Sequence, residues 1–234
     1  MGSFNRTQPA PPQHHRSQQP AQAAQHHPEQ APEQQQQPVV IPGLENLPAY
    51  DKRAGDYSQQ VVRLGGSFAR WTSFPIRVHL PMNTQENWHS SLDNAVKKWS
   101  QFIPVTVAPP NEPADIEVGW INHLMPRQLG ITNLEIFNGH PRVTIYLLRP
   151  SYYPPDVTEA SLQRVALHEL GHGLGLFGHS NNPADSMFAL DTPVKSGLPK
   201  TPTVTMRDVN TLRKVYEAQP LPDGFQSPQP ISWP

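Results

Sequence analysis

The 234-residue chain has no cysteine and almost equal numbers of acidic and basic residues. The lack of cysteine excludes disulfide bonds and thiolate metal ligands, but it does not identify a cellular compartment. With a formal net charge of -1, the chain shows no sign of the basic surface that binds nucleic acid or anionic membranes. We therefore expect no nucleic-acid partner.

Long apolar runs are also missing. No stretch approaches the ~20 consecutive apolar residues that a membrane-spanning helix needs, so the sequence predicts no membrane span. The first residues lack the apolar segment of a secretory signal peptide. These features leave the localisation of the protein open.

Core-forming residues are scarce at both ends of the chain. Residues 1–42 consist mainly of Gln, Pro, His and Ala, and such a segment cannot bury enough apolar surface to offset the entropy of ordering it. We predict a disordered N-terminal tail over residues 1–42 and an irregular Pro-rich tail over residues 219–234. Residues 43–218 remain as one compact domain of typical size.

The central part of the chain changes between two hydrophobic periodicities. Alternation of apolar and polar residues predicts a strand at 74–81, and the helical spacing of Trp88, Leu92, Ala95 and Trp99 predicts an amphipathic helix. Apolar runs predict four more strands, at 105–109, 115–121, 130–137 and 142–148.

Two further helices are predicted near the end of the domain. They cover 158–175, with Thr158 favoured over Ser161 as the N-cap, and 205–217. The order of elements predicts an α+β (mixed α/β) fold. We expect a five-stranded sheet that carries the first two helices, with the third helix beneath.

The segment HELGHGLGLFGHS, residues 168–180, contains the zinc-binding pattern H-E-x-x-H. At 3.6 residues per turn, His168 and His172 lie about 40° apart on one helix face, so both imidazoles can bind one ion. Glu169 lies beside the ion, where a carboxylate can act on a water molecule instead of coordinating. The plainer alternative is a helix with two ordinary histidines and a surface glutamate.

A catalytic zinc site needs a third protein ligand and keeps one position open for water. In the extended pattern H-E-x-x-H-x-x-G-x-x-H the third histidine would occupy the position of Gly178. Gly175 can adopt a positive φ and turn the chain back toward the metal. The candidates downstream are His179, Asp185, Asp191, Asp208 and Glu217. His179 is the nearest and the best match to zinc.

The segments HELGHGLGL and GHS resemble the metzincin metalloproteases, most of all the matrixin branch and its bacterial and cyanobacterial-type members. Met187 follows His179 by eight residues, the interval expected for the methionine turn of a matrixin. The segments RWTSFPIRVHL, ADIEVGW and MRDVNTLRKVY also occur in matrixin order. The resemblance covers about residues 70–217, but only the zinc helix and the methionine turn are specific.

The resemblance implies a zinc metalloendopeptidase with one catalytic Zn²⁺, bound by His168, His172 and His179. A zinc-activated water would hydrolyse the peptide bond with Glu169 as general base. The structural residues near the site would be Gly175, Met187 beneath the metal and Asp208 under the methionine turn.

The implied partner is a peptide or protein substrate. By resemblance it would lie antiparallel along 130–137, the edge strand, with an S1′ pocket formed by His172 and the loop after Met187. We expect a monomer, and only the resemblance suggests an extracytoplasmic or secreted location.

Three features depart from animal matrixins. The stretch between ADIEV and RVTIYLL is short and lacks the loops that hold structural zinc and calcium. No cysteine is available to block the zinc, and Arg207-Asp208 replaces a pair of aspartates. Two alternatives also remain open. One is a thermolysin-like enzyme with Glu217 as third ligand. The other is a non-catalytic zinc-bearing scaffold or interaction protein that acts through its Gln/Pro-rich tail.

Overall fold

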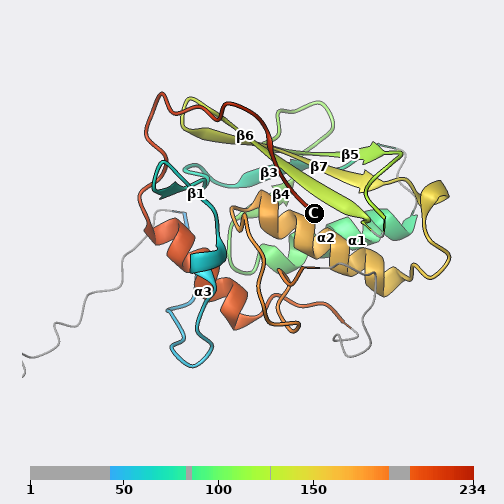
Figure 1. The fold of residues 1–234 in the computed structure, drawn as a ribbon, viewed down its shortest axis with the longest axis horizontal. Helices are drawn as coiled ribbons and strands as arrows, with labels where there is room; N and C mark the ends of the chain where they lie inside the picture. Colours follow the sequence, from blue (N-terminus) through green and yellow to red (C-terminus); the bar gives the residue numbers. More distant parts are fainter. Residues whose placement is uncertain (1–42, 83–85, 127, 190–200) are drawn as a thin grey trace, which may run out of the picture. The chain divides into compact units, whose positions relative to one another are not determined.

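The computed structural model describes residues 43–82, 86–126, 128–189 and 201–234 (Figure 1). The described residues belong to one compact unit. The predicted disordered tail, residues 1–42, lies outside them. Residues 219–234 belong to the same unit as the rest of the described chain.

The main sheet contains six strands in the order β4-β3-β5-β7-β6-β8. Their bounds are Ile76–His79 for β3, Val105–Val107 for β4, Ile116–Ile121 for β5, Gly130–Phe137 for β6, His140–Leu148 for β7 and Ile231–Trp233 for β8. Strands β4, β3, β5 and β7 are parallel, whereas β6 runs antiparallel to β7 and β8 runs antiparallel to β6. A separate two-stranded hairpin is formed by β1, Arg63–Leu64, and β2, Ser67–Phe68.

The mixed α/β fold is confirmed, but the expected count of five strands is wrong because the C-terminal segment adds a sixth. In β8, Trp233 pairs with Thr132 and Ile231 pairs with Leu134. The segment was expected to be irregular, yet it pairs there because Trp233 buries its ring at only 8% exposure. Strand β6, expected at the sheet edge, is therefore covered by β8.

Three α-helices accompany the sheet: α1, Glu86–Trp99, α2, Glu159–Gly173, and α3, Met206–Glu217. Helices α1 and α2 pack against each other on one side of the sheet, and α3 lies further from it (Figure 1). The predicted apolar stripe of α1 is buried. Two short 3-10 helices, Ser58–Gln60 and Pro150–Tyr152, complete the elements. Within the described residues, no helix has the length and apolar character needed to cross a bilayer.

Side-chain caps fix the start of α2. Thr158 is the N-cap, as predicted: its hydroxyl accepts a hydrogen bond from the Ser161 backbone at 3.2 Å. The Ser161 hydroxyl in turn accepts one from the Thr158 backbone at 3.3 Å. This reciprocal capping box satisfies two N–H groups that the helix itself leaves unpaired.

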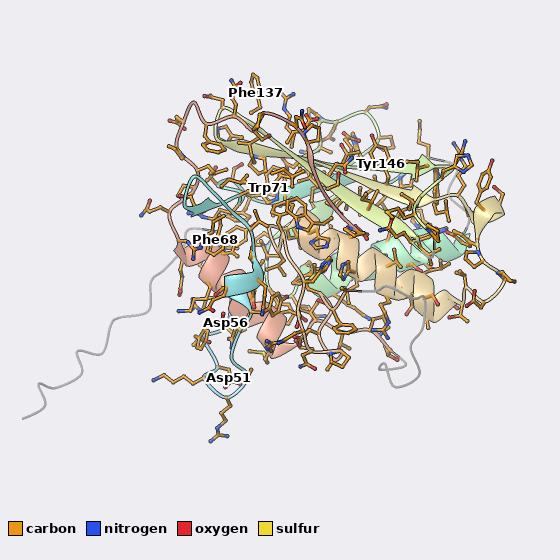
Figure 2. All side chains as sticks on the ribbon, in the orientation of Figure 1. Asp51, Asp56, Phe68, Trp71, Phe137 and Tyr146 are labelled. Carbon is orange, nitrogen blue, oxygen red and sulfur yellow. The ribbon has the colours of Figure 1, made fainter. Side chains whose placement is uncertain are left out.

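Aromatic side chains satisfy the other end of α2. The indole of Trp71, labelled in Figure 2, donates to the carbonyl of Gly173 at 2.8 Å. The Tyr216 hydroxyl of α3 donates to the carbonyl of Leu174 at 2.8 Å. Because the last carbonyls of a helix have no partners within it, these bonds fix the end of α2 relative to α3.

Candidate metal centre

The structure brings the three predicted histidine ligands together. One side-chain nitrogen from each of His168, His172 and His179 lies within 4.8 Å of the others, and the Nε2 atoms of His168 and His172 are 3.1 Å apart. Tetrahedral zinc with Zn–N bonds of 2.0–2.1 Å places its ligand nitrogens ~3.3 Å apart. The separation of the His168 and His172 nitrogens therefore fits a zinc ion, and the nitrogen of His179 lies within 4.8 Å of both. Among the described residues, this is the one such group of three or more metal-binding side chains.

Backbone carbonyls orient two of these rings. His168 donates from Nδ1 to the Ser186 carbonyl at 2.9 Å, and His172 donates from Nδ1 to the Leu176 carbonyl at 2.7 Å. With the proton on Nδ1, the Nε2 lone pair of each ring is free to face the metal.

Burial keeps these imidazoles neutral. It lowers the pKa of His168 to about 3, with the nearby charge of His179 acting in the same direction. Burial likewise lowers the pKa of His172 well below its usual value, with further contributions from His168 and His179. Neutral imidazole is the form that ligates metal.

The chain turns back toward the two helical histidines at Gly175, as the sequence predicts. Its φ is +107°, a conformation that residues with a Cβ rarely adopt. The backbone N–H groups of Gly175 and Leu176 close the end of α2 onto the carbonyls of His172 and Gly171, at 2.9 and 3.1 Å. This turn returns His179 to the other two histidines, so that one nitrogen of each ring lies within 4.8 Å of the others.

Gly178, the residue that displaces the third histidine by one position, packs against the N-terminal part of the described chain. A Cβ on Gly178 would overlap the carbonyl oxygen of Gln60. On the same loop, the Val62 N–H donates to the Phe177 carbonyl at 2.8 Å. The extra residue therefore lets the loop pack closely against residues 60–62.

The turn that carries Met187 packs against α2. Met187 is fully buried, and a Cβ on Gly171 would overlap its sulfur. The Ser180 N–H donates to the Met187 carbonyl at 2.7 Å, which couples the chain after His179 to this turn. The eight-residue interval between His179 and Met187 thus allows the residue after His179 to form a backbone hydrogen bond with Met187.

Asp208 connects this turn to α3 and to the N-terminal segment. Its carboxylate accepts hydrogen bonds from the Ser186 N–H at 2.9 Å and from the Tyr57 hydroxyl at 2.7 Å. Burial raises the pKa of Asp208, and these hydrogen bonds act in the opposite direction. Arg207, the departure from the matrixin pattern, pairs with the buried Asp185 at 2.6 Å.

Glu169 is buried at 3% exposure between α2 and β6. Its Oε2 accepts a hydrogen bond from the Thr132 hydroxyl at 2.6 Å. Burial raises the pKa of Glu169 to about 8, although the Thr132 bond acts to lower it. A Cβ on Gly130 would lie 2.7 Å from Cγ of this side chain.

Thr132 and Gly130 were not singled out in the sequence. Both lie on β6, distant from α2 along the chain, and only the fold brings them to Glu169. Their local signal is limited to a glycine at the start of a predicted strand, which indicates close backbone approach.

The C-terminal segment ends beside the histidines. Figure 1 shows the last residues running along β6 to a point next to α2. The Pro234 carbonyl accepts a hydrogen bond from His179 Nε2 at 3.0 Å. The Trp233 ring lies 4.8 Å from that of Phe177 and 6.2 Å from that of His172, measured between centroids. A hollow of about 500 Å³ opens beside Pro234.

The alternative third ligands are engaged elsewhere or lie outside the described residues. Asp185 pairs with Arg207, and Glu217 pairs with Arg213 at 3.1 Å. Asp191 falls within residues 190–200, outside the described part of the chain, as does most of the loop expected to form the S1′ pocket.

Comparison with known proteins does not assign the chain to a family. Neither a scan against models of protein families nor a search of curated proteins found a match.

Proposed function

We propose that the protein is a zinc-dependent metalloendopeptidase of the metzincin type, resembling the matrixin branch. The observation that carries the proposal is the approach of His168, His172 and His179 to within binding distance of one ion. Glu169 follows the first ligand on the same helix, and its carboxylate is buried against β6.

The donor set fits a catalytic zinc better than a structural one. Three imidazole ligands leave the fourth tetrahedral position free. A zinc ion bound there would supply a Lewis acid that polarises a carbonyl and makes water a stronger acid. The Ser186 and Leu176 carbonyls hold two of the imidazoles in the orientation that such an ion requires.

Glu169 would transfer the protons. Its carboxylate would accept a proton from the attacking water and pass it to the leaving amine. Thr132 holds one carboxylate oxygen through its hydroxyl, which restricts the rotation of the side chain. Burial excludes bulk water from the carboxylate, so the transferred proton stays near the scissile bond.

The peptide substrate would lie along the outer edge of β6. Strand β8 already pairs antiparallel with this edge, so the edge can accept an extended backbone. Binding by strand addition relies on main-chain hydrogen bonds and tolerates many sequences. This mode suits an endopeptidase.

The competing proposal is a zinc-bearing scaffold without catalysis. A buried glutamate beside the ligands favours the enzyme, because a structural zinc site has no use for a base at that position.

Casein cleavage and zinc content, measured for wild type, Glu169→Ala and Glu169→Gln, test the proposal. The same set is made in a Trp233→Ala background, because the C-terminal segment lies over the histidines. We expect both Glu169 variants to retain zinc and to lose cleavage by about 10²–10⁴-fold. Equal cleavage by wild type and Glu169→Ala would refute the assigned base. Zinc-loaded chains that cleave nothing in either background would favour the scaffold.

A further inference from the structure

We propose that residues 231–234 are a resident ligand of the peptide groove along β6, held in place by an aromatic anchor. An incoming extended peptide with an aromatic side chain at the position of Trp233 must displace them. The predicted effect on cleavage rests on the proposed function, whereas the predicted effect on peptide binding rests on geometry alone.

The first observation is the strand pairing. Residues 231–233 pair antiparallel with Thr132, Asn133 and Leu134 of β6, the strand whose Thr132 also holds Glu169. The Ser232 hydroxyl donates to the Asn133 side chain at 2.6 Å. The segment thus binds as an added β-strand, which is a recurrent mode of peptide recognition.

The second observation is the seat of the tryptophan. Trp233 is 8% exposed and packs against Phe177, which lies two residues before His179 on the same loop. His172 forms another part of its surroundings. A large flat ring buries substantial apolar area at this position, and an alanine would leave most of the space empty. The seat therefore selects an aromatic side chain.

The third observation is the position of Pro234. Its carbonyl oxygen lies 3.0 Å from Nε2 of His179, and the Pro234 backbone also forms a hydrogen bond with His168. A substrate carbonyl has to reach the same space. The seated segment and a bound substrate therefore exclude each other.

The segment is tethered independently of the groove. The Gly139 N–H donates to the Phe225 carbonyl at 2.8 Å, and the Gly224 N–H donates to the Asn138 side chain at 2.9 Å. These bonds lie at the turn between β6 and β7, next to Phe137 in Figure 2. Beyond the tether, residues 228–230 are exposed. Residues 231–234 can therefore leave the groove while the tether bonds remain in place.

Such a tether makes the segment an effective competitor. An intramolecular ligand on a short linker competes at an effective concentration on the order of millimolar. If residues 231–234 occupy the groove for nine-tenths of the time, the apparent affinity for an external peptide falls about tenfold. Removing the anchor should restore that affinity.

A peptide-binding experiment measures this competition directly. The probe is a fluorescent hexapeptide with the sequence of residues 229–234, QPISWP, followed by anisotropy at fixed zinc concentration. We expect at least about tenfold tighter binding to the Trp233→Ala chain than to wild type. Gln229→Ala, a change at an exposed residue of the same segment, should behave as wild type. The peptide QPISAP should bind none of the chains.

A reversible lock provides a second variant that does not depend on removing the anchor. Because the chain has no cysteine, Asn133→Cys with Ser232→Cys adds a single pair of thiols across β6 and β8. We expect oxidation to form the disulfide and to abolish probe binding by the double variant, and reduction with a phosphine to reverse both effects. The single variant Asn133→Cys controls for each change.

The outcomes separate this inference from the proposed function. Tighter probe binding by Trp233→Ala, together with a disulfide in the double variant, supports a resident ligand even if no chain cleaves casein. If the chains do cleave, Trp233→Ala should also lower KM, and the probe should inhibit it competitively. Equal probe affinity in wild type and Trp233→Ala, or failure of the disulfide to form in folded protein, would overturn the inference.

Discussion

Glu169 is held in a space that β6 leaves open for it. The Thr132 hydroxyl binds its carboxylate at 2.6 Å, and Gly130 presents only backbone to the rest of the side chain. A methyl group at Gly130 would lie 2.7 Å from Cγ, 2.9 Å from Oε1 and 2.9 Å from Val165. The position of the proposed base therefore depends on a glycine in a different element.

Gly130→Ala should displace the Glu169 carboxylate without removing any metal ligand. We expect kcat for peptide cleavage to fall by roughly tenfold or more, since proton transfer depends on the position of the base, while zinc content stays unchanged. Gly119→Ala is the matched control, because a Cβ there meets Tyr146 at an ordinary 3.5 Å. Full activity in Gly130→Ala would show that this packing does not position the base.

The histidine trio could be predicted from the sequence because two of its members are four residues apart on one helix. That spacing alone places both on the same face, and the glycine turn predicted at Gly175 has the expected positive φ. Thr132 could not be predicted, because its contact with Glu169 depends on how β6 lies against α2. No local pattern encodes that placement.

At the scale of elements, the loop after α2 explains the late third histidine. Gly178 approaches the Gln60 carbonyl so closely that any side chain would overlap it. No positive φ accompanies this glycine, so the requirement comes from packing between the loop and the N-terminal segment. The added residue and the segment that accommodates it form one structural unit.

Gly178→Ala should separate the loop from residues 60–62. We expect a loss of about 1–3 kcal/mol in the free energy of unfolding, the usual cost of overpacking a tight contact. For a domain of this size that corresponds to a fall in Tm of roughly 2–12 °C. Thermal denaturation followed by circular dichroism measures it, with Gly119→Ala as control. An unchanged Tm would contradict the packing role of Gly178.

The helices and five of the strands in the main sheet follow from hydrophobic periodicity, but β8 does not. Strand β8 has three residues and lies between Pro230 and Pro234, too short a run to show alternation. Its pairing comes from the Trp233 anchor and from the tether at Gly224 and Phe225. These are tertiary effects, and the composition of the segment points away from them.

Across the whole molecule, the candidate metal centre joins parts that are distant in sequence. Helix α2 supplies two histidines, the following loop supplies the third, and the methionine turn orients His168 through Ser186. Asp208 of α3 then connects this turn to Tyr57. A bound ion would stabilise all of these contacts together, because it binds only the folded arrangement of ligands.

Removal of the metal should therefore lower the stability of the whole domain. At a free zinc concentration 100-fold above the dissociation constant, binding contributes about 2.7 kcal/mol, which corresponds to roughly 5–11 °C in Tm. We expect a chelator to lower Tm by this order and added zinc to restore it. A Tm that does not respond to zinc would mean that the histidines do not form a metal site in the folded protein.

Zinc stoichiometry is the most direct test of the central claim that His179 completes the metal centre. The metal content of wild type, His179→Ala and His140→Ala, a control at an exposed histidine, is measured by mass spectrometry after dialysis against metal-free buffer. We predict about one zinc per chain in wild type and His140→Ala, and a severe loss in His179→Ala, because two helical imidazoles alone make a poor site. Equal zinc content in all three chains would contradict the account.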